Sequence, residues 1–298
     1  IILKQDSIEK RYLSRLTTNF IKTCFGFATL GMVPKALGPE DFGNFSFLTN
    51  FFTTTTKLLK SGFFSAFSTK LSRRQHEKKI IGFFVYYLLS VVALLIMGTY
   101  SILLFGFEEI IWPNQNTIII YAAAAYAVLL LISETNQVIV DSLGYTVKLE
   151  MKIILQSLFS TILIIILYFT STLTLRSFFL LHYSILIFVI ISGWRILSRN
   201  KVFIIKQLDV TKNDIISYTK EFFTYSHPLI VYSLVVFFNS IFDRWILQHY
   251  YGSEEQGYFS LAFKVAGIMF LFTSSMSTLL ARDMSQSYIN RSKTEIKL

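Results

Sequence analysis

Long runs without a charged residue are the feature that most limits what this chain can fold into. Four of them contain no Asp, Glu, Lys or Arg: residues 80–107, 112–133, 153–175 and 222–242. Each is at least as long as the roughly 20 residues that a helix needs to cross about 30 Å of hydrocarbon. Strands of a membrane barrel would be shorter and would alternate between apolar and polar residues. The sequence therefore predicts an all-α, polytopic membrane protein.

Eight membrane spans are predicted, and the positions of the basic residues orient them. The spans cover residues 16–36, 42–67, 80–105, 116–140, 152–174, 177–195, 227–249 and 256–281. Basic residues gather on the side of the N-terminus, whereas the other side holds only Lys35 and Arg176. The positive-inside rule then makes the N-terminus cytoplasmic. The net charge of +10 thus follows from topology, and we expect no nucleic acid as a partner.

One short turn sequence occurs twice, as "GPEDFGNFS" and as "GSEEQGYFS". Gly38 corresponds to Gly252 and Gly43 to Gly257, each pair separated by 214 positions. Turn chemistry alone accounts for the glycines, the acids and Pro39. It does not account for Phe-Ser in both copies, so the repeat favours an internal duplication. Gly38 and Gly252 suit the end of a helix, where a residue without Cβ is preferred.

The distance between the copies predicts how the chain is organised. Six spans separate them, and parallel six-helix repeats are one way to build a transporter with a substrate path between the halves. We therefore expect a six-helix lobe over 1–195, a cytoplasmic linker over 196–226, and the first helix pair of a second lobe plus a tail over 227–298. Two complete lobes need about twelve spans, so we expect the natural protein to continue beyond Leu298.

Charged residues within the spans are the best candidates for a site. Each costs about 3 kcal/mol or more at the centre of a membrane helix, so it must face a cavity or a partner. Five of the seven are basic, which predicts a cationic cavity. The seven are Lys22, Lys57, Lys60, Glu134, Asp243, Arg244 and Lys264.

These charges differ in what they suggest. Lys57 and Lys60 share one helix face, and they either line a cavity or extend to the inner headgroups. Arg244 and Lys264 lie in the outer half of their spans, which favours a cavity role. Glu134 either pairs with a lysine or carries a coupling proton or ion.

Several chemistries have no sequence support. The four histidines are scattered, Cys24 is the single cysteine, and no phosphate-binding glycine loop occurs. The outer loops are too short to hold a catalytic domain. We therefore expect neither a metal site nor a cofactor nor an enzyme.

The two repeat regions, "ALGPEDFGNFSF" and "FDRWILQHYYGSEEQGYFSLAFKV", resemble a known family. They are similar to Wzx-type O-antigen flippases, the polysaccharide-transporter branch of the multidrug/oligosaccharidyl-lipid/polysaccharide exporter superfamily. The resemblance implies a two-lobe bundle like that of the multidrug exporters (MATE-like), with 12–14 spans around a V-shaped cavity. It also implies basic residues at the positions of Arg244, in "DRWIL", and Lys264, in "AFKV".

The implied function is transport in the bacterial inner membrane. Such proteins move undecaprenyl-diphosphate-linked oligosaccharides from the cytoplasmic to the periplasmic leaflet, among membrane lipids and other polysaccharide assembly proteins. Three alternatives stay open. A drug/cation antiporter would need a cavity with net acidic charge, and a glycan polymerase or ligase would need a large outer loop. A non-transporting scaffold would not need basic residues in the outer half of its spans.

Overall fold

The computed structural model describes residues 8–74, 77, 79–200, 202 and 209–267. Within these residues all regular secondary structure is helical, which confirms the predicted class. The chain divides into two compact units between Gly257 and Tyr258. The helices are α1 (Ile8–Leu30), α2 (Met32–Lys60), α3 (Phe63–Arg73), α4 (Lys79–Leu104), α5 (Glu108–Ile111), α6 (Thr117–Ser142), α7 (Thr146–Phe169), α8 (Leu175–Arg199) and α9 (Lys212–Gly267).

Five of the described helices are long and apolar enough to cross a membrane, namely α4, α6, α7, α8 and α9. They coincide with the third to seventh predicted spans. Their apolar runs need no partner to become helical, because a helix satisfies all of its own backbone groups in lipid. The chain is therefore a multi-pass membrane protein. The eighth predicted span, 256–281, is helical as far as Gly267, and the rest of it lies outside the described residues.

The first two predicted spans are helical but less regular than expected. Gly31 separates α1 from α2 with helical dihedral angles, φ −83° and ψ −27°, so the first true break comes at Gly38. The prediction of one continuous span over 42–67 is wrong, because α2 ends at Lys60 and α3 starts at Phe63. Gly62 has a φ of 72°, a left-handed conformation that a residue without Cβ adopts at little cost. Neither α1 nor α2 is among the five apolar helices.

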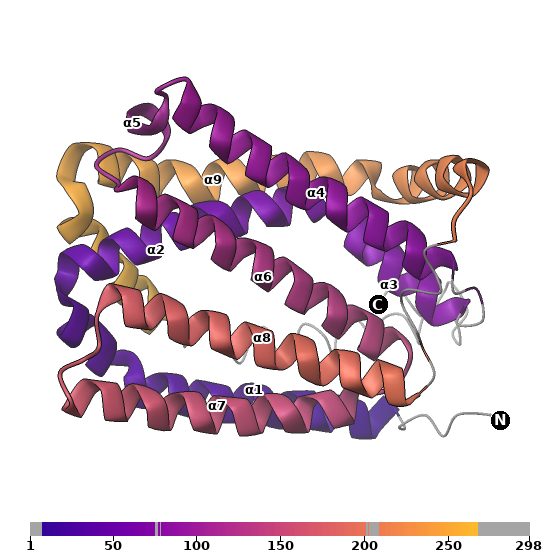
Figure 1. The fold of residues 1–298 in the computed structure, drawn as a ribbon, viewed down its shortest axis with the longest axis horizontal. Helices are drawn as coiled ribbons and strands as arrows, with labels where there is room; N and C mark the ends of the chain where they lie inside the picture. Colours follow the sequence, from indigo (N-terminus) through magenta and orange to yellow (C-terminus); the bar gives the residue numbers. More distant parts are fainter. Residues whose placement is uncertain (1–7, 75–76, 78, 201, 203–208, 268–298) are drawn as a thin grey trace, which may run out of the picture. The chain divides into compact units, whose positions relative to one another are not determined.

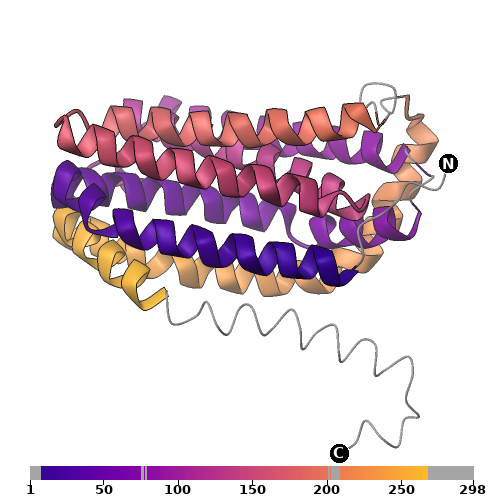
Figure 2. The ribbon, with the colours of Figure 1, turned by 90° about the horizontal axis from the view of Figure 1, so that it is seen from below.

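Most of the close helix pairs of the first unit are not neighbours in the sequence. α1 lies along α7, and α6 lies along both α8 and α2 (Figure 1). Figure 2 shows α8 along one side of this unit and the middle of α9 along the other, with the first turns of α9 at one end. We use "inner end" for the end that holds Arg11 and Ser142, and "outer end" for the end that holds Gly38 and Gly252, following the predicted orientation.

A cluster of buried apolar side chains lies at the inner end. It joins α3, the start of α4, the α6–α7 turn and the first turns of α9. Phe67 stacks on Phe84 with ring centroids 3.9 Å apart. Phe222 of α9 is fully buried and its ring lies 5.1 Å from that of Phe83. This packing fixes the start of α9 against the preceding helices.

Ion pairs surround the same contact. Glu221 of α9 pairs with Lys70 and, at 3.0 Å, with Arg74. Asp214 pairs with Lys79 at 3.0 Å. The hydrogen bond from Lys79, followed by those from Thr211, lowers the pKa of Asp214. Asp214 lies in the first turn of a helix of 56 residues, which is far longer than a bilayer is thick.

Helices extend into both ends of the predicted linker over 196–226. α8 continues to Arg199, and α9 runs without a break from Lys212 through the seventh predicted span. Both predicted linker boundaries, at 195–196 and 226–227, therefore lie inside helices. Residues 201 and 203–208 lie outside the described residues, and the division into two lobes stays a prediction.

The middle of α9 is the least packed part of this helix. Its large apolar side chains are mostly exposed, between 60% and 68% for Val231, Tyr232, Val235, Phe238 and Phe242. Near the outer end the helix is held again, because Trp245 Nε1 donates to the Ile110 carbonyl at 2.8 Å. α9 is thus held against the preceding helices near its start and again near Trp245.

Candidate functional site

The structure brings two of the predicted site residues, Lys60 and Glu134, into contact, and Lys57 lies beside Lys60 on the same helix. Lys60, at the end of α2, forms an ion pair through its Nζ with Oε2 of Glu134 on α6. The Lys60 side chain is 13% exposed and that of Glu134 is 32% exposed. The Lys60 ammonium also lies over the Phe64 ring, 4.9 Å from its centroid. Lys57 precedes Lys60 by about one turn of α2 and is exposed.

The depth of this pair distinguishes it from a headgroup contact. Glu134 precedes Ser142, the last residue of α6, by eight positions, which corresponds to about 12 Å along the helix. Ser142 also donates to the Ser68 carbonyl, so α3 continues the course of α2 beyond the break toward the inner end. Lys60 therefore meets a carboxylate well inside the helical layer. Lys57, Lys60 and Glu134 together carry a net charge of +1.

The other predicted charges lie on different elements. Lys22 is exposed on α1. On α9, Asp243 is exposed and Arg244 is half-buried near the outer end. Lys264 is exposed in the described part of the second unit. In the described residues none of these four charges forms an ion pair with the Lys60–Glu134 pair.

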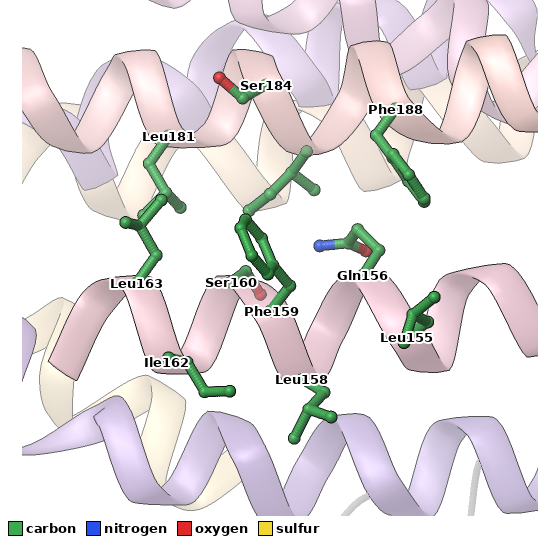
Figure 3. A pocket seen from close by; sticks show the side chains of 11 residues that line it. Leu155, Gln156, Leu158, Phe159, Ser160, Ile162, Leu163, Leu181, Ser184 and Phe188 are labelled. Atoms are coloured by element: carbon green, nitrogen blue, oxygen red, sulfur yellow. The ribbon is translucent and has the colours of Figure 1, made fainter. Parts of the chain in front are cut away.

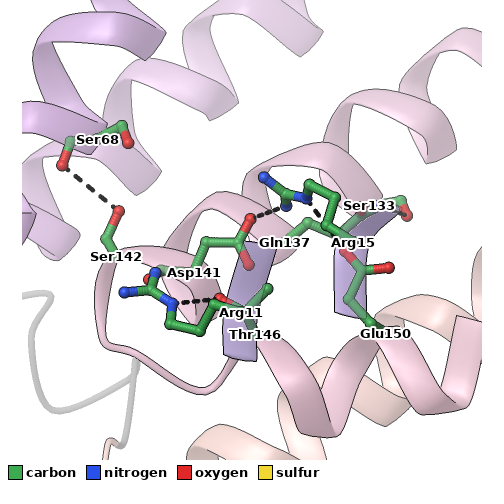
Figure 4. A network of polar contacts seen from close by, with 9 residues as sticks. All are labelled: Arg11, Arg15, Ser68, Ser133, Gln137, Asp141, Ser142, Thr146 and Glu150. Carbon is green, nitrogen blue, oxygen red and sulfur yellow. Dashed lines mark hydrogen bonds and ion pairs between the residues drawn. The ribbon is translucent and has the colours of Figure 1, made fainter. Parts of the chain in front are cut away.

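Sequence reasoning missed a charged network at the inner end (Figure 4). Arg15 of α1 pairs with Asp141, and at 3.2 Å with Glu150 of α7. Arg11 donates from Nε to the Thr146 hydroxyl at 2.9 Å and from Nη2 to the Asp141 carbonyl. The network joins α1 to the α6–α7 turn. Glu150 was passed over because the fifth span was predicted to start at 152, whereas α7 starts at Thr146.

A second polar cluster was also missed, at the outer end. Gln115 donates from Nε2 to Asn44 Oδ1 at 2.8 Å and to Ser253 Oγ at 3.4 Å. Gln248 donates from Nε2 to Ser253 Oγ at 2.9 Å and to the Pro113 carbonyl at 3.2 Å. These amides lie near predicted turns, where polar residues are ordinary, so no spacing in the sequence marks them.

A pocket between α7 and α8 has a different chemistry. It has a volume of about 530 Å³ and is lined mostly by leucine, isoleucine and phenylalanine side chains (Figure 3). Its polar side chains are those of Gln156, Ser160 and Ser184. It contains none of the predicted cationic residues, so it does not suit an anion. Among the described residues, no group of three or more His, Cys, Asp or Glu would hold a metal ion.

The comparison with known proteins gives one match. A family model described as "Polysaccharide biosynthesis protein" matches residues 10–280, about nine-tenths of the chain. No curated protein and no solved structure matches. The match covers the turn repeat, the Lys60–Glu134 pair and Arg244.

Proposed function

This chain belongs to the polysaccharide biosynthesis protein family, the Wzx-like flippases of the multidrug/oligosaccharidyl-lipid/polysaccharide exporter superfamily, and from that premise we propose its activity. It moves undecaprenyl-diphosphate-linked oligosaccharide units from the cytoplasmic to the periplasmic leaflet, by alternating access through a cationic cavity. The family match over residues 10–280 is the observation that carries this proposal. The pair of lysines within the helical layer supports it.

The charge of the substrate explains why lysines are needed there. A lipid diphosphate carries about two negative charges, and an unpaired charge is very costly to place in hydrocarbon. Ammonium groups form strong, charge-assisted hydrogen bonds with phosphate oxygens. Lys57 is exposed and Lys60 is one turn away, so both can face one diphosphate. Arg244 and Lys264 are proposed as further contacts along the route, and Lys22 as one on α1.

Glu134 gives the site a way to respond to its substrate. It neutralises Lys60 in this structure, and an arriving diphosphate competes with it for the same ammonium group. A displaced Glu134 carboxylate would lose its partner and bind a proton or another cation more readily. We propose that this exchange couples substrate binding to ion binding, with Asp243 as a further acid on the route.

A reconstituted flipping assay tests the proposal. The full-length protein is placed in lipid vesicles with undecaprenyl-diphosphate-linked glycan, and the glycan reaching the opposite leaflet is measured over time. We expect Lys60→Ala to lower the rate roughly tenfold or more, because one of two cations facing the diphosphate is lost. Lys35→Ala removes the same charge from an exposed position near the outer turn and is the matched control.

Two results would argue against the proposal. Transport by Lys60→Ala at the parental rate would exclude this lysine from the site. Transport of a cationic dye in place of the glycan would instead favour a drug antiporter.

A further inference from the structure

The two copies of the turn have the same backbone conformation. Gly38 has φ 80° and ψ 165°, and Gly252 has φ 84° and ψ −171°. These angles lie in a region that is essentially restricted to glycine. Each glycine interrupts a helix that otherwise continues. The sequence repeat is therefore also a structural repeat, with the helix bent in the same way in both copies.

The two copies also touch each other, and they do so reciprocally. A Cβ on Gly43 would overlap the carbonyl oxygen of Ser253 and come within 2.9 Å of the Gly257 nitrogen. A Cβ on Gly257 would overlap the carbonyl oxygen of Pro39 and come within 3.2 Å of its Cα. Ser253 and Gly257 follow Pro39 and Gly43 by 214 positions each. Each copy thus presents the same two residues to the other, as at an interface with twofold symmetry.

We call these four residues, Pro39, Gly43, Ser253 and Gly257, the repeat contact. Its backbones approach so closely because neither glycine has a side chain, as at other close crossings of membrane helices. At Gly98, by contrast, an added Cβ would meet nothing within 4 Å. A single methyl group added at Gly43 or Gly257 should therefore prevent the repeat contact from forming.

Several buried amide atoms next to the repeat contact have no hydrogen-bond partner among the described residues. Gln256 is fully buried, and both polar atoms of its side chain are without a partner among the described residues. The side-chain oxygens of Gln115 and Gln248 also have no hydrogen-bond partner among the described residues. Each buried group of this kind costs about 1–3 kcal/mol when it is left without a partner. The cluster is thus tightly packed, but several of its buried polar atoms form no hydrogen bond among the described residues.

From these observations we propose that the repeat contact is the outer gate of the transporter, closed in this structure. The close backbone approach keeps water out, and the unpaired amides make closure only slightly favourable, because separating the two turns would hydrate them. Opening separates the α2 copy from the α9 copy. The role of this opening in transport rests on the proposed function, but the opening itself can be measured without transport.

Thiol accessibility tests the gate. The full-length protein with Cys24→Ser and Gln256→Cys is treated from outside with a membrane-impermeant thiol reagent. Gly43→Ala should raise the labelling rate roughly tenfold or more, since the closed contact cannot form around the added methyl group. Gly98→Ala is the matched control and should leave the rate unchanged. Equal rates in Gly43→Ala and the parent, both correctly inserted, would overturn the proposal.

A second test holds the gate closed with a crosslink, without adding bulk to a helix. Gln115→Cys and Ser253→Cys are bridged by a short, cleavable bifunctional thiol reagent, which holds the two sides together. Glycan transport should stop on bridging and return when the bridge is cleaved. Unchanged transport after complete bridging would overturn the gate. If the unmodified protein transports no glycan but Gly43→Ala still raises labelling, the proposed function fails and the gate is retained.

Discussion

α9 contacts the preceding helices at the inner end and at the outer end of the first unit, and the two contacts are built differently. At the inner end Phe222 is fully buried among aromatic rings, and Glu221 and Asp214 make ion pairs around it. At the outer end the contact consists of glycine backbones and buried amides, several of them without partners among the described residues. Between these ends the apolar side chains of α9 are largely exposed.

This difference suggests a division of roles. Buried aromatic side chains contribute strongly to packing because each removes a large apolar area from water, so the inner contact resists separation. Close backbone packing without satisfied polar groups is easily lost when water can replace it. We infer that α9 stays attached at its inner end while its outer end moves.

The largest expected effect is at the inner end. Phe222→Ala removes a fully buried ring and should lower the free energy of unfolding by about 3–5 kcal/mol. Phe223→Ala, at the neighbouring residue with a 55% exposed side chain, should change it far less. Thermal unfolding of the purified protein in detergent compares the two. Equal losses would mean that Phe222 does not fix α9.

An effect of opposite sign is expected at the outer end. Gln256→Leu replaces an amide without partners by an apolar side chain of similar size, and should raise stability by about 1–3 kcal/mol. The same substitution should slow glycan transport, because it favours the closed contact. Gln115→Leu is the control, since this glutamine donates to Asn44 and Ser253 and should not stabilise when replaced. A loss of stability in both variants would contradict the account of the outer contact.

The smallest expected effect concerns the ion pairs. Glu221→Gln removes the partner of Lys70 and Arg74, and should lower the free energy of unfolding by roughly 1 kcal/mol or less. High salt should reduce the difference between this variant and the parent, because it screens partly exposed charges. Unfolding measured at low and high salt checks this. If Glu221→Gln lowers the free energy of unfolding as much as Phe222→Ala, the ion pairs and not the aromatic rings are what mainly hold the inner contact together.

The sequence predicted the apolar helices better than the contacts between them. α4, α6, α7 and α8 follow from uncharged runs, because lipid leaves the backbone little alternative to a helix. The break at Ser61–Gly62 was missed, since a glycine between apolar residues also fits a continuous helix. Its position against Ser226, where a Cβ on Gly62 would overlap that side chain, depends on a helix far along the chain.

The site was predictable in its residue types and not in its pairing. The cost of intramembrane charge identified Lys60 and Glu134, and the structure shows that they meet. The partners of Arg15, more than 120 positions away, follow no local spacing. The reciprocal contact of Gly43 and Gly257 likewise arises from the arrangement of the two copies, although the repeat itself was visible in the sequence.

Distances between spin labels at the two ends of α9 test the central claim most directly. In a Cys24→Ser background, one pair is placed at the exposed positions Glu40 and Tyr251, and the other at the exposed positions Ser72 and Thr219. Lipid-linked diphosphate glycan is then added to the full-length protein in vesicles. We predict that the distance between the labels at 40 and 251 increases by well over the roughly 1–2 Å of a small helix shift. The distance between the labels at 72 and 219 should change by no more than that. A larger change at the inner pair, or none at the outer pair, would contradict the account.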